Sequence, residues 1–178
     1  MNREQFEHLI AAAAQIIDLD EFVVVGSQAV LGAVAEVPES MLVSMEADVY
    51  PLRQPARAVE VDGAIGDGSQ FHRSFGYYAH GVGPETAKLP RGWEARRLRV
   101  EVSARVGSKR KPVAYCPEIH DLVLSKLAAG RPRDIEYARA AKAHALVDVA
   151  VLSERVGELP SDDREDTHGR VTALIATL

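Results

Sequence analysis

The sequence predicts a mixed α/β fold (α+β), with a small mixed β-sheet lobe over residues 1–116 and a helical lobe over residues 117–178. Residues 22–25 are a continuous apolar run rich in β-branched side chains, typical of a strand buried on both faces. Residues 96–105 alternate apolar and charged side chains, typical of a half-exposed strand. After Pro117, apolar residues recur at helical spacing. The length suits one compact domain or a small α/β lobe with a helical appendage.

The first elements follow from local patterns. Residues 3–17 place apolar side chains at helical spacing, which predicts an amphipathic helix. After the first strand, Gly26 and Ser27 turn the chain into a short predicted helix over residues 28–35, with Ser27 as its N-cap. A second strand is predicted over residues 41–50 and ends at a proline.

The later elements are predicted in the same way. Asp134 follows a Gly- and Pro-containing turn and is expected to be the N-cap of a helix. The remaining predicted elements are a helix over 55–65, a loop that enters a strand at Tyr77, a short strand over 113–115, and helices over 118–129, 134–146, 148–157 and 165–177.

Composition and charge narrow the classes of function. The net charge of −5 argues against broad, sequence-independent nucleic-acid binding, which needs a basic surface. A basic run over residues 91–111 leaves two interpretations open, an RNA-facing patch or a solvated strand edge and loop. The single cysteine, Cys116, rules out an intrachain disulfide and a cysteine-based zinc site, and is expected to be packed.

Targeting and common-motif signals are missing from the sequence. No apolar run approaches the roughly 20 residues of a membrane span, and the polar opening of the chain does not resemble a signal peptide. The expected location is therefore cytoplasmic, without a membrane partner. The glycine-rich patterns of P-loop ATPases, esterases and dinucleotide-binding enzymes do not occur.

Two carboxylates one residue apart are the first candidate site. Because strand side chains alternate, Glu46 and Asp48 are expected to share a face, where they can hold a divalent cation. A solvated face on which the pair has no role is the alternative. The turn at Gly26 and Ser27 offers free amides to a phosphate, or serves only as a strand-to-helix turn.

A second group lies in the predicted helical lobe. Lys126 interrupts an apolar helix and can neutralise triphosphate charge, with Asp134 to orient it. The alternatives are a surface lysine and a helix N-cap. His72 is a candidate contact to phosphate or base, and Tyr77 and Tyr78 can stack a base or belong to the core. The other histidines show no metal-ligand spacing, namely His8, His80, His120, His144 and His168.

On these residues the chain resembles the polymerase-β-like nucleotidyltransferase superfamily, and most closely its small bacterial members from abortive-infection and toxin–antitoxin systems. The matching segments are Gly26-Ser27, Glu46-Ala47-Asp48, Asp121 to Leu127 and Arg133-Asp134. The resemblance covers residues 20–140. It departs from the family pattern at Glu46, where an aspartate is usual.

The resemblance implies a role for each matched residue. Ser27 and the amides after Gly26 would bind the β- and γ-phosphates, and Glu46 and Asp48 would hold Mg²⁺ or Mn²⁺. Lys126 would steady the triphosphate, supported by Asp134. A third carboxylate is expected from a later strand, for which Glu101 is the candidate.

Three functions follow as hypotheses. The first is metal-dependent transfer of a nucleotide from a nucleoside triphosphate to an acceptor hydroxyl on RNA, protein or a small molecule. The second is a catalytically inactive domain of this type that binds nucleotide or protein. The third is an interaction module whose alanine-rich helix over 135–145 pairs with a partner. An antitoxin or a second copy of the chain would be such a partner.

Overall fold

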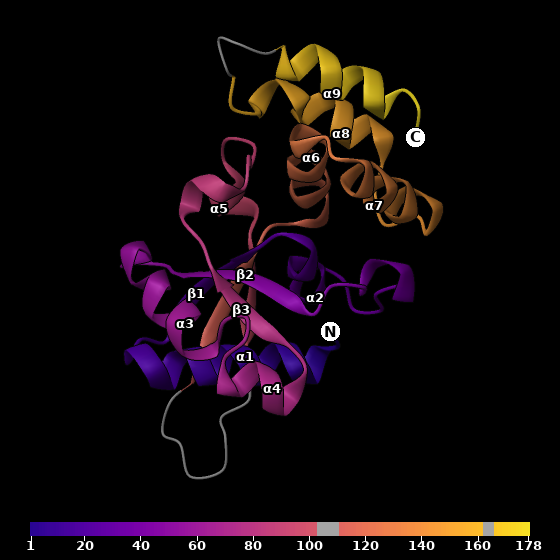
Figure 1. Cartoon of the computed structure of the whole chain (residues 1–178). Coiled ribbons are helices and arrows are strands. Elements are labelled where there is room, and N and C mark those ends of the chain that lie inside the picture. The colour runs from indigo at the N-terminus through magenta and orange to yellow at the C-terminus, as the bar shows by residue number, and fades with distance from the viewer. Residues whose placement is uncertain (103–110, 162–165) are drawn as a thin grey trace.

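The computed structural model describes residues 1–102, 111–161 and 166–178, and it has the predicted mixed α/β architecture (Figure 1). Within these residues, five strands form one sheet in the order β3-β2-β1-β5-β4. Their bounds are Glu21–Val25 (β1), Glu46–Pro51 (β2), Tyr78–Gly81 (β3), Leu98–Glu101 (β4) and Val113–Cys116 (β5). The central strand β1 is antiparallel to β2 and parallel to β5. The outer strand β3 is parallel to β2, and β4 is antiparallel to β5.

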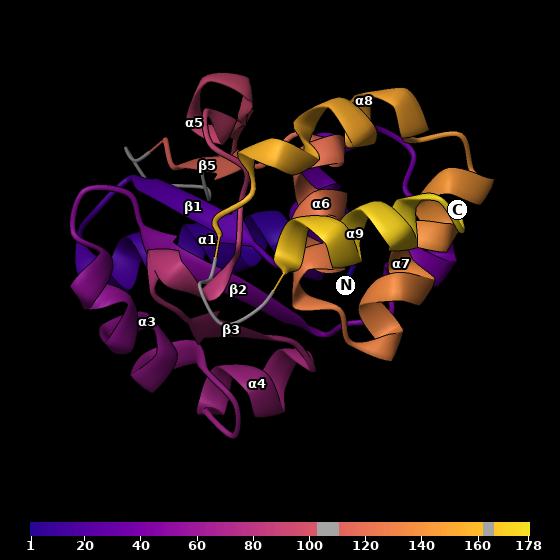
Figure 2. The ribbon, with the colours of Figure 1, turned by 90° about the horizontal axis from the view of Figure 1, so that it is seen from above.

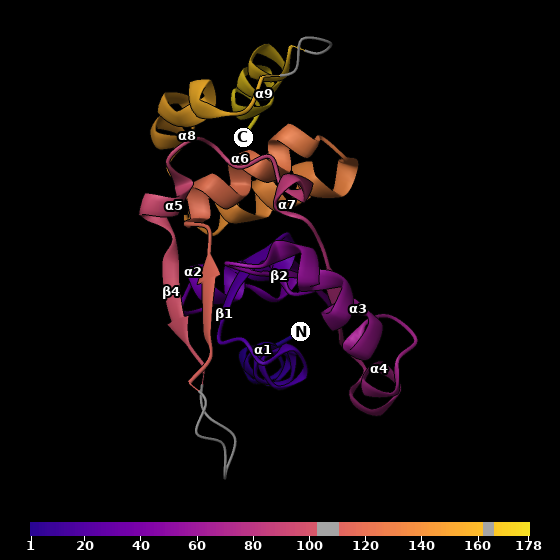
Figure 3. The same cartoon turned by 90° about the vertical axis from the view of Figure 1, so that its left-hand side faces the viewer.

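Helices surround this sheet. Helix α1 lies at one end of the molecule, helices α6 to α9 gather at the other end, and the sheet lies between them (Figure 3). Seen from above, α3 and α4 lie together on the side opposite α7 and α9 (Figure 2). The helices are α1 (Arg3–Ile17), α2 (Val30–Ala33), α3 (Ala58–Ile65), α4 (Gln70–Phe75), α5 (Trp93–Arg96), α6 (Ile119–Ala129), α7 (Pro132–Ala143), α8 (Val149–Arg155) and α9 (Thr167–Ile175).

Local chemistry explains where the first helix begins. Asn2 accepts a hydrogen bond from the backbone N–H of Gln5, and the Gln5 side chain accepts one from the backbone N–H of Asn2. This reciprocal capping box satisfies two amide groups that the first helical turn would leave unpaired. The apolar side of α1, which includes Phe6 and Leu9, is fully buried against the sheet. The sequence pattern therefore predicted both the helix and its buried face.

The central strand is buried on both faces, as the apolar run predicted. Phe22 and Val24 face the main core, which also contains the buried sides of α1, α6 and α7. Val23 and Val25 face a smaller cluster with Tyr50, Ala58, Val82 and Leu89. Because β1 is fixed from both sides, its last residue has a well-defined position from which the next turn begins.

Several predicted boundaries were wrong. The second strand starts at Glu46 rather than at residue 41, because Glu39–Met41 forms a 3₁₀ turn. Residues 70–75 form α4 rather than a loop, since the Ser69 hydroxyl accepts a hydrogen bond from His72 N–H and caps the helix. The strand predicted over 96–105 is β4, which ends at Glu101. Residues 103–105 of the predicted strand lie outside the described residues.

Two predicted caps were also wrong. Ser27 opens a 3₁₀ turn, Ser27–Ala29, and makes no side-chain cap there. Arg131 is the N-cap residue of α7, which places Asp134 at the third helical position rather than at the cap. Both side chains are therefore available for other contacts, which are described below.

The remaining expectations have mixed outcomes. Cys116 is fully buried, as expected, and burial raises the pKa of its thiol to about 12. Among the described residues, no helix has both the length and the apolar character that a membrane span requires. The division at residues 116 and 117 stays a prediction.

Candidate functional site

The two predicted carboxylates lie at the start of β2. Glu46 and Asp48 are partly exposed, whereas the intervening Ala47 and the following Val49 are fully buried. The alternation of faces along β2 is therefore as expected. In the sheet register, Asp48 lies between Val25 of β1 and His80 of β3, so it occupies the point where β1 ends.

The turn after β1 presses directly against Asp48. Gly26 has φ +68°, a conformation that L side chains rarely adopt. A Cβ atom at this position would lie 2.1 Å from Asp48 Oδ2, so only glycine lets the turn approach the carboxylate so closely. Glycine is required here for both backbone conformation and space.

Contacts from the helical side fix Ser27. Lys126 Nζ of α6 donates a hydrogen bond to Ser27 Oγ over 2.9 Å, although the two residues are 99 positions apart in the sequence. The Tyr137 hydroxyl of α7 donates to the Ser27 carbonyl oxygen over 3.0 Å. The phosphate-binding turn expected from the sequence is thus tied to both helices.

Lys126 and Asp134 form a buried ion pair. Lys126 Nζ lies 3.2 Å from Asp134 Oδ1, and these side chains are 11% and 1% exposed. Arg131 Nε lies 2.7 Å from the other oxygen, Asp134 Oδ2. Burial raises the pKa of the Asp134 carboxyl, but the Arg131 hydrogen bond and the Lys126 charge outweigh burial and hold it below its usual value. The interpretation of Lys126 as a solvated surface lysine is wrong.

A histidine joins the two carboxylates. Glu46, Asp48 and His80 each offer a ligand atom, and these atoms all lie within 4.8 Å of one another. His80 Nδ1 is 2.9 Å from Asp48 Oδ1. The histidines show no ligand spacing along the sequence, but His80 reaches the group from the neighbouring strand. Two carboxylates and an imidazole are a donor set that fits a divalent cation.

The charge balance also fits a cation. Among the described residues, no lysine or arginine forms an ion pair with Glu46 or Asp48. Burial raises the pKa of Asp48, and the nearby Glu46 charge adds to this effect, while His80 and Lys126 oppose it. Burial lowers the pKa of His80, but its hydrogen bond to Asp48 and the Asp48 charge produce a net rise. A bound cation would relieve the repulsion between the two acids.

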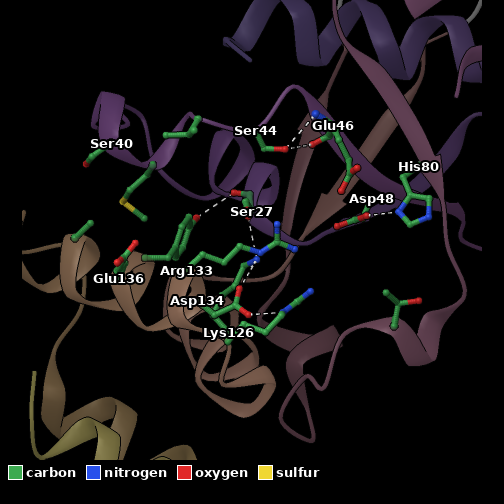
Figure 4. Close-up of a pocket in the computed structure, with 16 residues that line it drawn as sticks. Ser27, Ser40, Ser44, Glu46, Asp48, His80, Lys126, Arg133, Asp134 and Glu136 are labelled. Carbon is green, nitrogen blue, oxygen red and sulfur yellow. Dashed lines mark hydrogen bonds and ion pairs between the residues drawn. The ribbon is translucent and has the colours of Figure 1, made fainter. Parts of the chain in front are cut away.

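These groups surround one pocket of about 660 Å³. Figure 4 shows Glu46, Asp48 and His80 on one side and Lys126 and Asp134 on the other, with Ser27 between them. The acidic wall consists of Glu46, Asp48 and His80, the basic wall of Lys126, Arg131 and Arg133, and the apolar part of Met41, Val43, Tyr137 and Ala140.

The structure does not bring Glu101 to this pocket. Glu101 pairs with Val113, which in turn pairs with Glu21 at the start of β1, whereas Asp48 pairs with the end of β1. Three strand spacings, roughly 14 Å, also separate β4 from β2. Glu101 instead forms an exposed ion pair with Arg99. The third group beside Glu46 and Asp48 is His80.

His72 lies behind the site rather than in it. Its ring packs against that of Tyr78 at a tilt of 44°, with ring centroids 4.6 Å apart. The Tyr78 hydroxyl donates to Glu46 Oε2 over 2.9 Å, and this bond, together with burial, raises the pKa of Tyr78 to about 12. Tyr77 is buried, and its hydroxyl oxygen lies 2.5 Å from His8 Nδ1. The interpretation of Tyr77 as a core residue is therefore confirmed.

Asp121, which belongs to the matched helix segment, lies outside the pocket. It is fully buried and accepts hydrogen bonds from Arg96 and Arg155 at 2.8 to 3.1 Å. These bonds link α6 to α5 and α8. Arg96 belongs to the basic run, so this part of the run is structural.

Sequence reasoning missed three groups of the pocket. His80 shares a face with Tyr78 two positions earlier, and this alternation is a weak signal that only the pairing of β3 with β2 makes specific. Arg131 and Tyr137 lie one helical turn before and one after Asp134; Arg131 pairs with Asp134, and Tyr137 donates to the Ser27 carbonyl oxygen. Neither carries a distinctive motif.

Comparison with known proteins identifies the family of the chain. No curated protein and no solved structure matches the chain. Residues 4–171 match the family described as "Nucleotidyltransferase of unknown function (DUF6036)". This match spans nearly the whole chain and includes both walls of the pocket. The chain therefore belongs to this nucleotidyltransferase family.

Proposed function

We propose that the protein is a metal-dependent nucleotidyltransferase that moves a nucleotide from a nucleoside triphosphate to an acceptor hydroxyl. The observation that supports this most strongly is the division of one pocket into an acidic wall, with Asp48, and a basic wall, with Lys126, on either side of the Ser27 turn. A cation and a polyphosphate are the two ligands that such a division suits.

The basic wall would bind the triphosphate. Lys126 has its ammonium group held between Ser27 and Asp134, so it is positioned before any ligand arrives. Arg133 lines the same pocket, and its guanidinium group adds a second positive charge for the phosphates. The first amides after Gly26 would contribute neutral donors beside these cations.

The acidic wall would act at the α-phosphate. Glu46 and Asp48 would hold a divalent cation, Mg²⁺ or Mn²⁺ by the family resemblance, which would supply Lewis-acid polarisation of the α-phosphate and lower the pKa of the acceptor hydroxyl. Glu46 is held for this role by the Tyr78 hydroxyl. Asp48 is held by His80 and by the closely packed backbone at Gly26.

The transfer forms one bond and breaks one bond at the α-phosphorus. A bond forms between the acceptor oxygen and the α-phosphorus, and the bond from that phosphorus to the oxygen bridging towards the β-phosphate breaks. Pyrophosphate leaves with the electron pair, and the hydroxyl proton passes to solvent. Lys126 would stabilise the charge that gathers on the departing pyrophosphate.

The class of acceptor stays open between RNA, a protein and a small molecule, and an antitoxin partner stays a prediction of the resemblance. The acidic net charge and the structural role of Arg96 give no special support to RNA. These choices do not affect the nucleotide half of the reaction, which can be tested by itself.

Nucleotide transfer can be tested with triphosphates radiolabelled on the α-phosphate. The protein is incubated with each of the four nucleotides, Mg²⁺ or Mn²⁺, and either transfer RNA or the protein alone as acceptor, and pyrophosphate release is followed in parallel. Asp48→Asn should lower the rate by at least about 100-fold, because it removes a main electrostatic group. Glu154→Gln is the matched control, since Glu154 is an exposed carboxylate on α8 and does not line the pocket.

If the protein binds nucleotide in a metal-dependent way but releases no pyrophosphate in the presence of any of the acceptors, the transferase proposal is contradicted. That outcome would favour the inactive nucleotide-binding domain, the alternative that the glutamate at position 46 suggests. Label transfer that is equal in the wild-type protein and in Asp48→Asn would contradict the assignment of the site.

A further inference from the structure

The third group of the acidic wall is an imidazole where the family resemblance led us to expect a carboxylate. Parallel pairing of β3 with β2 puts His80 beside Asp48 and Tyr78 beside Glu46. The backbone after His80 is fixed, because Gly81 N–H donates to Asp62 Oδ1 over 3.0 Å and Val82 N–H donates to the Val49 carbonyl over 3.1 Å. The position of His80 therefore comes from the sheet.

The imidazole is placed to reach a ligand in the pocket. His80 lines the pocket, and its side chain is 52% exposed, so the ring has room to adjust. It lies 2.9 Å from Asp48 Oδ1 and within 4.8 Å of the ligand atom of Glu46. Asp48 is its ion-pair partner among the described residues, and a cation would sit between groups that already lie together.

The opposite ligand is supported from behind. Tyr78 donates to Glu46 Oε2, and the ring of His72 packs on Tyr78. His72 Nδ1 in turn accepts a hydrogen bond from Gly68 N–H over 3.1 Å. Such outer contacts orient the ligands of metal sites and are costly to lose. The chain thus positions one carboxylate and one imidazole on adjacent strands.

We propose that His80 is a direct ligand of the metal and makes this site select Mn²⁺ over Mg²⁺. This inference rests on the proposed function, because it concerns the cation of the same pocket. Mg²⁺ is a hard ion that takes oxygen ligands almost exclusively, whereas first-row transition ions accept imidazole nitrogen readily. Mn²⁺ combines that tolerance with a strong affinity for the carboxylates of Glu46 and Asp48.

Direct Mn²⁺ binding tests the proposal without any turnover. Electron paramagnetic resonance of free Mn²⁺ gives the dissociation constant, and competition with Mg²⁺ gives the selectivity. We expect wild-type protein to prefer Mn²⁺ by at least about tenfold, and His80→Asp to reduce this preference by about tenfold or more, through weaker Mn²⁺ and stronger Mg²⁺ binding. His144→Asp, at an exposed histidine after α7, is the matched control and should leave both constants unchanged.

A spectroscopic measurement on the wild-type protein decides the question even if a variant does not fold. Electron spin-echo modulation from an imidazole nitrogen should appear in the Mn²⁺ complex and be missing from that of His80→Asp. A Mn²⁺ complex without this modulation would overturn the role of His80.

The outcomes separate this inference from the proposed function. Loss of Mn²⁺ binding in Asp48→Asn, together with unchanged selectivity in His80→Asp, would overturn the role of His80 and leave the metal site standing. Unchanged Mn²⁺ binding in both variants would overturn both. Selectivity that falls in His80→Asp and also in His144→Asp would reveal a general charge effect, which would likewise contradict the assignment of His80.

Discussion

On the sheet side of the pocket, all three ligand candidates come from two adjacent strands, whereas the charged groups on the helical side come from α6, α7 and the turn between them. Glu46 and Asp48 follow from strand alternation, and His80 is added by one strand pairing. Lys126, by contrast, meets Ser27 across 99 positions of sequence. The two carboxylates of the acidic wall thus follow from local geometry, whereas the basic wall is a product of how the helices pack on the sheet.

This difference predicts how each wall responds to mutation. A change at Asp48 in the acidic wall should affect metal binding and leave the fold intact or even stabilised, because its burial opposes the ionised form of the carboxyl in the folded protein. A change in the basic wall should affect both nucleotide affinity and stability, because its ion pair also holds the helices to the Ser27 turn.

The largest expected effect is that of Lys126→Met. It should weaken triphosphate binding by about 10- to 100-fold, the range for loss of one charge-assisted contact. It should also lower the free energy of unfolding by about 2–3 kcal/mol, because Asp134 is 1% exposed and keeps only Arg131 as a partner. Calorimetric nucleotide titration and urea unfolding measure the two effects.

Lys142→Met is the matched control, since Lys142 lies in the last turn of α7 and does not line the pocket. The double variant Lys126→Met with Asp134→Asn should lose less stability than the sum of the single changes, because the two residues share one ion pair. A stable Lys126→Met protein with wild-type nucleotide affinity would show that the basic wall does not bind phosphate.

Next in size is Gly26→Ala. The added methyl group would collide with Asp48 Oδ2, and alanine is strained at φ +68°. We expect a loss of about 2 kcal/mol in the free energy of unfolding, at the scale of a strained backbone position. At this chain length, a melting temperature lower by roughly 4–8 °C would correspond to that loss.

Gly63→Ala provides the comparison. Gly63 lies within α3, and a Cβ atom there would meet nothing within 4 Å. That variant should be stabilised by about 0.5–1 kcal/mol, because alanine has the better helix propensity. Equal melting temperatures for the two variants would rule out the tight contact between the Gly26 turn and Asp48.

A smaller effect, of opposite sign, is expected for Asp48→Asn without metal. The pKa of Asp48 is raised in the folded protein, so its ionisation above the ordinary carboxyl pKa opposes folding. The variant should therefore melt at a higher temperature than the wild-type protein at pH 7.5 in a chelator. This advantage should shrink as the pH falls towards the ordinary carboxyl pKa. A lower melting temperature at pH 7.5 would show that Asp48 supports the fold.

The smallest expected effect is that of Glu101→Gln. This variant tests whether the third metal ligand is Glu101, as predicted from the sequence, or the histidine that lies beside the site. Glu101 is an exposed residue on β4 with one surface ion pair, so metal affinity should change by less than about twofold and the melting temperature should stay close to that of the wild-type protein. A loss of metal binding comparable to that of Asp48→Asn would restore Glu101 as a ligand.

The sequence predicted much of what depends on near neighbours. The β1 strand, the shared face of Glu46 and Asp48, and most helices were recoverable from the spacing of apolar side chains. The boundary at residue 41 failed because Val43 and Met45 are apolar but exposed, so composition suggested a strand that the backbone does not form.

The parts that failed depend on contacts between distant segments. His80 becomes a ligand candidate only through the parallel pairing of β3 with β2, which its own segment does not specify. Glu101 was chosen as a ligand because the sequence alone does not give the strand order. That order places β4 at the edge of the sheet, away from β2. Asp134 looked like a cap, because the buried lysine that pairs with it cannot be seen from its own helix.

The most direct test of a metal-dependent nucleotide site is calorimetric titration of a non-hydrolysable nucleoside triphosphate with and without Mn²⁺. Wild-type protein, Asp48→Asn and Lys126→Met are compared. We expect Mn²⁺ to raise the affinity of the wild-type protein and of Lys126→Met, and to have no such effect on Asp48→Asn. Nucleotide affinity that is independent of Mn²⁺ in the wild-type protein, or equally dependent on it in Asp48→Asn, would contradict the division of the pocket into a metal wall and a phosphate wall.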